Sequence, residues 1–187
     1  MSKGKQSRDE QELVERIAAG DRQAFQLFYE QSYGKVARYV NKLVSNETLA
    51  EDVLTQTYMV AWQKMGSFKG SSRLATWLIG IARNIAFKEF RKNRIHEPFN
   101  ETYVAADNTS HLKPEQQDRK AKMKQALIAL SANHREALEL VFYQGLTYPE
   151  VSKIIDVPVN TIKTRIFHAK KALKEELKKR EITADDI

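Results

Sequence analysis

Residues 145–173 constrain the fold most, because their pattern predicts two short helices joined by a tight turn. Thr147, followed three residues later by Glu150, has the spacing of a capping box and begins the first helix. Its apolar residues are Val151, Ile154 and Ile155. Pro158 has no backbone N–H and keeps its predecessor out of helical geometry, so the first helix must end before it.

The second helix of this stretch has one apolar and one polar face. Asn160 or Thr161 is expected to cap it. Its apolar residues recur at intervals of four, three and four, as one buried stripe requires: Ile162, Ile166, Ala169 and Leu173. The opposite face is polar and basic, and carries Asn160, Thr164, Phe167 and Lys171, flanked by Lys163 and His168. This pattern predicts a helix-turn-helix that presents its second helix to a DNA major groove. An αα-hairpin with a solvated basic face is the alternative.

Most of the rest of the chain also has helical periodicity, with apolar residues at spacings of three and four rather than two. Residues 95–113 are the exception, because they are polar, contain Pro98 and have no helical period. We expect a helix from Glu10 to Gly20, a second that begins near Arg22 and a third that begins after a break at Ser32. Further helices are expected over residues 48–65, 74–93, 114–130 and 133–143. The fold class is therefore all-α, with two small helical bundle domains joined by a flexible linker, the second containing the helix-turn-helix. The predicted parts are a disordered lead (1–9), a first domain (10–94), a linker (95–114), a second domain (115–180) and a tail (181–187).

The composition restricts the function. The net charge of +7 and the pI near 9.5 favour a polyanionic partner. The absence of cysteine excludes disulfides and thiolate metal sites, and the four histidines lack ligand spacing, so we expect neither a metal nor another cofactor. No apolar run approaches the roughly 18 residues of a membrane span, and the polar N-terminus lacks a signal peptide. We therefore expect a cytoplasmic protein without membrane insertion.

Catalysis has little support in this sequence, and no catalytic residue is predicted. The segment GSFKGSS lacks the Gly-Lys-Ser/Thr ending of a phosphate-binding loop. Glu51 and Asp52 are adjacent in a predicted helix, so their side chains diverge by about 100° and cannot converge on one reacting atom. A solvated acidic face, or a docking surface for a basic partner, is the better interpretation.

Residues 68–94 combine aromatic and cationic side chains, a composition typical of surfaces that bind single-stranded nucleic acid. Phe68, in the loop before the basic helix, is the candidate for stacking on a base. Trp62 and Trp77 fall on apolar stripes and are expected in the core. Asn84 faces away from the stripe, and its amide suits a base edge. A helix-surface position without a role is the alternative for Asn84.

Two long motifs, in this order, resemble the extracytoplasmic-function (ECF) sigma factors of the sigma-70 family, the minimal bacterial transcription initiation factors. AEDVLTQTYMVAW (50–62) and FKGSSRLATWLIGIARNIAFKEFRK (68–92) are similar to region two of that family. LSANHREALELVFYQGLTYPEVSKIIDVPVNTIKTRIFHAKKAL (130–173) is similar to region four, and residues 13–36 are similar to the family's first helices. The resemblance covers nearly the whole chain apart from its tails and linker.

The resemblance implies a protein that binds core RNA polymerase and directs initiation at promoters with −10 and −35 elements. It implies docking on the polymerase β′ coiled coil through Glu51, Asp52, Thr55 and Gln56. The residues implied for −10 recognition and strand opening are Phe68, Lys69, Gly70, Ser71, Arg73, Asn84, Lys88, Arg91 and Lys92. Those implied for the −35 element are Asn160, Lys163, Thr164, Arg165, Phe167, His168 and Lys171. The other implied partners are promoter DNA, the polymerase β flap and an anti-sigma factor or other regulator.

The sequence departs from the family pattern on the docking face, where Leu49 and Gln56 stand in positions that usually hold acids. This departure raises the hypothesis that phosphorylation of Thr55 or Thr57 restores negative charge and switches on core binding. Simple drift, with docking intact, is the alternative. Lys88 also stands where an aspartate is common in the family.

Two other functions are compatible with parts of the pattern. One is a helix-turn-helix regulator that acts at an operator without being a polymerase subunit. The basic helix bearing Asn84 argues against it, because a sensor domain has no need of such a helix. The other is a helical interaction module that never touches DNA, in which Lys163→Ala and Arg165→Ala would leave promoter occupancy unchanged.

Overall fold

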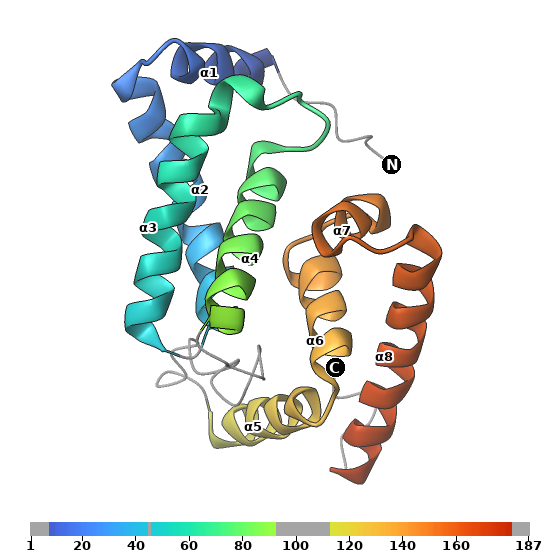
Figure 1. The fold of residues 1–187 in the computed structure, drawn as a ribbon. Coiled ribbons are helices and arrows are strands. Elements are labelled where there is room, and N and C mark those ends of the chain that lie inside the picture. The colour runs from blue at the N-terminus through green and yellow to red at the C-terminus, as the bar shows by residue number, and fades with distance from the viewer. Residues whose placement is uncertain (1–7, 45, 93–112, 181–187) are drawn as a thin grey trace. The chain divides into compact units, whose positions relative to one another are not determined.

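The structure is a computed structural model that describes residues 8–44, 46–92 and 113–180. The chain divides into two compact units, Met1–His96 and Glu97–Ile187 (Figure 1). All regular elements within the described ranges are helices, which confirms the all-α class predicted from the spacing of apolar residues. The predicted lead, linker and tail fall almost entirely on residues outside these ranges. Arg8 and Asp9, which were assigned to the disordered lead, are helical.

The first unit is built from α1 (Arg8–Ala18), α2 (Arg22–Leu43), α3 (Glu47–Lys64) and α4 (Leu74–Lys92), with a short 3₁₀ turn, η1 (Met65–Ser67), after α3. Helices α2, α3 and α4 pack against one another, and α1 crosses one end of them beside η1 (Figure 1). Their buried apolar faces form the core, which includes Phe28, Val36, Tyr39, Val40, Leu43, Val53, Ala61, Leu78, Ile79, Ala82 and Phe90.

Helix α2 is one continuous helix of 22 residues, so the expected break at Ser32 is wrong. The Ser32 hydroxyl donates to the Phe28 carbonyl at 2.6 Å, within the same helix. It also lies 3.0 Å from the hydroxyl of Tyr58 on α3. A serine that pairs inside the helix in this way does not have to end it, although serine usually competes with helical structure.

Asp21 is the N-cap of α2 and stabilises the first turn of that helix. Its carboxylate accepts the backbone N–H groups of Gln23 and Ala24 at 2.9 and 3.0 Å. It also pairs with the Arg16 guanidinium at 2.8 Å. The hydrogen bond from Ala24, followed by that from Arg16, lowers the pKa of Asp21.

A lowered carboxyl pKa in the folded state stabilises the protein above the unfolded pKa, and this contribution is lost as the pH falls through the folded value. We therefore expect the melting temperature of the wild type to fall more than that of Asp21→Asn between about pH 6 and about pH 3. Asparagine is a suitable control because it is also a good N-cap residue. Thermal unfolding of both proteins at each pH measures this difference. If the melting temperatures of the two proteins fall equally with pH, the charge of Asp21 does not contribute to stability.

The second unit is built from α5 (Pro114–Ile128), α6 (Ala132–Leu138), a π-helical turn η3 (Glu139–Tyr143), α7 (Tyr148–Ile155) and α8 (Val159–Lys179). The helix expected over 133–143 is thus α-helical only to Leu138. Helix α8 packs against α6, α7 and the end of α5. The buried apolar residues of this unit include Ala126, Leu130, Ala137, Leu140, Leu146, Val151, Ile162, Ile166, Ala169 and Leu177.

The pair α7–α8 has the helix-turn-helix form predicted from the sequence. The Glu150 carboxylate accepts the backbone N–H of Thr147 at 2.9 Å and its hydroxyl at 2.7 Å, as the capping spacing predicted. Asp156 ends α7 in the left-handed region, with φ of 60°. Pro158 is the N-cap of α8, so the expectation of a cap at Asn160 or Thr161 is wrong. The helix begins directly after the proline, and both polar residues lie in its first turn.

None of the helices in the described ranges is long and apolar enough to cross a membrane. The same residues contain no cluster of histidine and acidic side chains that could hold a metal ion.

Candidate functional site

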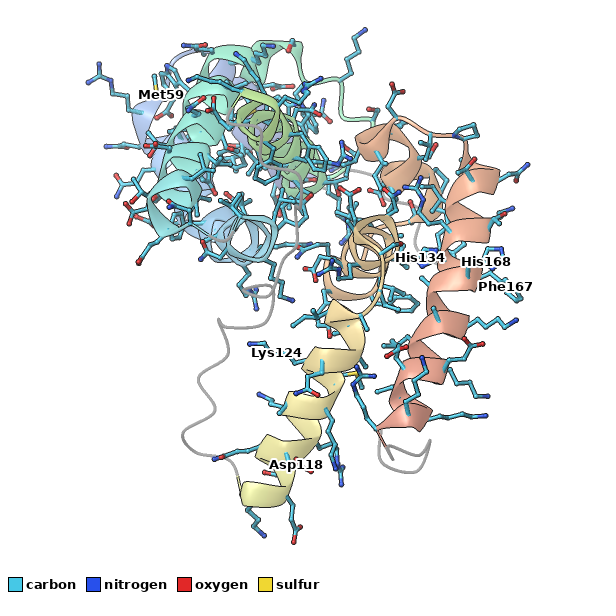
Figure 2. The ribbon with its side chains drawn as sticks, turned by 60° about the horizontal axis from the view of Figure 1, so that its bottom comes forward. Met59, Asp118, Lys124, His134, Phe167 and His168 are labelled. Carbon is cyan, nitrogen blue, oxygen red and sulfur yellow. The ribbon has the colours of Figure 1, made fainter. Side chains whose placement is uncertain are left out.

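The outer surface of α2 and α3 carries a groove with a volume of about 600 Å³, which we call the aromatic groove. Its aromatic residues recur every four positions on each helix, so they line up along one face. Met59 is 57% exposed and projects from α3 into the solvent (Figure 2). The groove is lined by Phe25, Tyr29, Tyr33, Glu51, Leu54, Thr55, Tyr58, Met59 and Trp62.

Tyr58 is the buried aromatic residue among those that line the aromatic groove. Its ring centroid lies 4.6 Å from that of Tyr29 and 6.4 Å from that of Tyr33. Burial raises the pKa of Tyr58 to about 12, so the phenol stays neutral. Because Ser32 uses its proton on the Phe28 carbonyl, the Tyr58 hydroxyl donates to Ser32. These contacts fix the floor of the groove.

The four predicted docking residues are all exposed, but they do not share one environment. Glu51 and Thr55 line the aromatic groove, whereas Asp52 and Gln56 lie beside it on α3. Thr57 is 0% exposed, and its hydroxyl donates to the Val53 carbonyl at 2.6 Å. A kinase cannot reach Thr57 in the folded unit, which leaves Thr55 as the candidate phosphosite.

The loop between η1 and α4 holds a pair of aromatic rings. Phe68 packs on Trp77 with ring centroids 5.1 Å apart, and both side chains are half-buried. Trp77 was expected in the core, but the buried centre of α4 lies at Leu78 and Ile79 instead. Trp62 was also expected in the core, but it is only partly buried and lines the aromatic groove. The other predicted loop residues Lys69, Ser71 and Arg73 are exposed, and Gly70 is partly buried with φ of 63°.

One face of α4 presents the polar residues predicted for the −10 element. Asn84, Lys88 and Arg91 are exposed and follow one another at spacings of four and three, so they form one stripe. Trp77 lies seven residues before Asn84 and belongs to the same face. Lys92 is also exposed, next to Arg91. This stripe combines a partly exposed aromatic ring, an amide and cations.

Helix α8 presents a polar face with an exposed aromatic ring. Phe167 is 65% exposed, and its ring meets that of His168 at a centroid distance of 5.4 Å (Figure 2). The Thr164 hydroxyl donates to the Asn160 carbonyl at 3.0 Å. Lys163 and Lys171 are exposed as well. These side chains lie on the face opposite the buried stripe, as their spacing predicted.

Arg165 departs from this arrangement because it is only partly exposed. Its buried Nη1 atom has no hydrogen-bond partner among the described residues. Burial, and then the nearby charges of His168 and Arg165, lower the pKa of His134 on α6. Arg165 therefore lies on the side of α8 that faces α6.

Several surface residues were missed by the sequence analysis. Tyr29 and Tyr33 follow Phe25 at intervals of four, a spacing that could have indicated the aromatic groove. Two other contacts join residues from different helices. His134 interacts with His168 and Arg165. The amino group of Lys170 lies 4.8 Å from the centroid of the Phe142 ring. No local pattern in the sequence could have placed these together.

The chain is similar to known proteins over most of its length. The family described as sigma-70 region 2 matches residues 28–95, and that described as sigma-70, region 4 matches residues 120–173. An ECF RNA polymerase sigma-E factor of Haemophilus influenzae is 30% identical over 181 residues, covering 90% of this chain and 95% of that protein. An RNA polymerase sigma-H factor of Pseudomonas aeruginosa is 29% identical, covering 90% and 93%.

Solved structures show the same relationship. The sigma factor RpoE of Bartonella quintana, crystallised with the anti-sigma factor NepR, matches with a TM-score of 0.65 and 30% identity. The match covers 82% of this chain and 96% of that one. CnrH, solved in complex with the cytosolic domain of CnrY, has the same TM-score at 20% identity and shows the likeness of the fold.

Proposed function

Because this chain belongs to the ECF sigma factors of the sigma-70 family, we propose that its first unit docks on core RNA polymerase and opens the −10 element while its second unit binds the −35 element. As a sigma factor, the chain binds core polymerase and directs promoter-specific initiation of transcription. It has no enzymatic activity of its own, since the polymerase carries the chemistry. We assign residues 10–94 to region two, 95–114 to the linker and 115–180 to region four.

The exposed stripe on α4 carries this proposal, because a DNA-binding regulator without polymerase has no need of it. Trp77, with Phe68 packed on it, offers ring faces to an unstacked base, and base–aromatic stacking contributes about 1–3 kcal/mol. The amide of Asn84 has donors and an acceptor for a base edge. Lys88 and Arg91 supply charge for neighbouring phosphates. Together these groups suit a melted strand.

The aromatic groove supports docking on the polymerase β′ coiled coil. An amphipathic helix binds by placing its apolar face in a groove of this kind. Tyr29, Tyr33 and Met59 offer exposed apolar surface, and Glu51 lies on the same groove as a partner for a cation. Asp52 and Gln56 lie at its side. We assign the groove and these neighbours as the polymerase-docking site.

The exposed face of α8 suits the −35 element. Lys163 and Lys171 are exposed cations suited to phosphates, while the 65% exposed ring of Phe167 suits contact with a thymine methyl group. Asn160, Thr164 and His168 supply hydrogen-bonding groups beside it. We assign Arg165 a supporting position at the edge of this surface, since it is partly buried against α6. The β flap of the polymerase is a further proposed contact of this unit.

Run-off transcription with purified core polymerase tests the proposal directly. We expect transcripts that start at a fixed distance downstream of −10 and −35 elements only when the chain is added. Mapping of start sites after overexpression supplies a template that contains both elements. Binding to such DNA without any transcription by added core polymerase would favour the operator-binding regulator instead.

We also propose an anti-sigma factor or another regulator as a partner of this chain. The Bartonella quintana relative was crystallised with an anti-sigma factor and is similar over 82% of this chain. The aromatic groove is a suitable binding site for this regulator. A regulator that occupied the groove would compete with core polymerase and block docking.

Thr55 offers a test of the phosphorylation hypothesis. It lines the aromatic groove one turn after Glu51, so a negative charge there would extend the acidic side of the groove. We expect Thr55→Glu to bind core polymerase about two- to fivefold more tightly than Thr55→Ala, the effect of one exposed ion pair. Equal affinities of the two variants, with no phosphate detected on the protein from cells, would end the hypothesis.

A further inference from the structure

The start of α4 is bonded to a residue near the beginning of the chain. The Glu10 carboxylate, on α1, accepts the backbone N–H of Leu74 at 2.9 Å, although the two residues are 64 positions apart. Leu74 is the first residue of α4 and is 4% exposed. The bond therefore joins α1 to the point where the loop ends and the DNA-facing helix begins.

Helix α4 needs an acceptor from elsewhere at this end. The first N–H groups of a helix have no partner inside it, and α4 has no acidic residue in its first turn. A carboxylate at this position also meets the positive end of the helix dipole. Hydrogen bonds to an ionised acceptor are about twice as strong as those between neutral groups. Glu10 thus supplies from α1 what the sequence of α4 lacks.

Helix α1 also contacts the other end of the same loop. It packs against η1, the turn from which the loop departs. A β-carbon built on Gly66 would lie 3.8 Å from that of Ala18, which shows how closely the two backbones approach. Both ends of the segment that carries Phe68 are therefore held by α1.

We propose that Glu10 is a positioning residue for promoter opening. It holds the start of α4, and with it the Phe68–Trp77 pair, in the geometry that receives an unstacked base. Glu10 itself does not touch DNA. This inference rests on the proposed role of the loop at the −10 element. It adds α1, to which neither Phe68 nor Trp77 belongs, to the parts of the protein that contribute to DNA opening.

The test compares Glu10→Ala with Glu10→Gln and with Glu12→Ala, using the full chain bound to core polymerase. Glu12 is exposed on the same helix, so its substitution removes the same charge without the bond to Leu74. Opening is followed by the fluorescence of 2-aminopurine placed in the −10 element of duplex DNA. We expect opening by Glu10→Ala to be about tenfold slower, because small displacements of positioned groups have effects of this order or larger.

Glu10→Gln keeps an oxygen acceptor and is expected to restore most of the rate, while Glu12→Ala resembles the wild type. Affinity for core polymerase and for −35 DNA should be unchanged in all three variants. A loss of core affinity by Glu10→Ala would indicate general destabilisation and overturn the positioning role. Opening by Glu10→Gln that is as slow as that by Glu10→Ala would also overturn it.

Phe68→Ala separates this inference from the function on which it rests. If Phe68→Ala opens DNA slowly and Glu10→Ala opens it at the wild-type rate, the positioning role is wrong and the role of the loop stands. If Phe68→Ala itself opens DNA at the wild-type rate, the proposed role of the loop fails.

Discussion

Replacing Met59 with lysine is expected to weaken binding to core RNA polymerase about 100-fold, equivalent to about 2.7 kcal/mol. Met59 is 57% exposed and lines the aromatic groove, so docking would bury its side chain against apolar surface. A lysine there would place a charge against the apolar surface of the partner, and burial of even a neutral unpaired polar group costs about 1–3 kcal/mol in mutational data. The fold should be unaffected, because the side chain faces solvent in the free protein.

The measurement is a titration of labelled protein with core polymerase. Leu27→Lys is the matched control, because Leu27 is also an exposed apolar residue (47%) but does not line the groove. Circular dichroism should show equal helix content for both variants. If Leu27→Lys weakens binding as much as Met59→Lys does, the groove is not the docking site.

The double variant Lys163→Ala with Lys171→Ala is expected to bind −35 DNA about 50-fold more weakly at about 0.1 M salt. Each phosphate contact releases about 0.9 counterion, which corresponds to about 1.2 kcal/mol at that concentration. The plot of log affinity against log salt concentration should become shallower by about two units. Both lysines are exposed on α8, so their removal should not disturb the core.

Fluorescence anisotropy at several salt concentrations measures both the affinity and the slope. Arg119→Ala with Lys120→Ala removes two exposed cations from α5 and serves as the control for net charge. Equal slopes for the two double variants would mean that the face of α8 makes no special contact with phosphates.

The local features of the fold were predictable from the sequence, because they depend on residues a few positions apart. The bond between Thr147 and Glu150 follows from a spacing of three, and the burial of Ile162 and Ile166 follows from a spacing of four. The family membership followed from two long motifs in order, and the matches to known sigma factors confirm it.

Most of the features that were missed depend on neighbours from other helices. Ser32 suggested a break, but its hydroxyl is paired inside a continuous helix beside Tyr58. Thr57 looked available for modification, but packing in the first unit leaves it 0% exposed. The bond from Glu10 to Leu74 spans 64 positions, so no local pattern could indicate it. Tertiary packing decided the cases of Thr57 and Glu10, whereas a hydrogen bond within α2 satisfies Ser32.

The position of Tyr58 links partner binding to the heat resistance of the first unit. Its hydroxyl is paired with Ser32, while its ring lines the aromatic groove. A partner that binds the folded groove and not the unfolded chain raises the melting temperature in proportion to the logarithm of its concentration. A thermal-shift screen of the free protein can therefore detect molecules that bind the groove. A substitution of Tyr58 that is chosen to change which partner binds will also change the stability of the first unit.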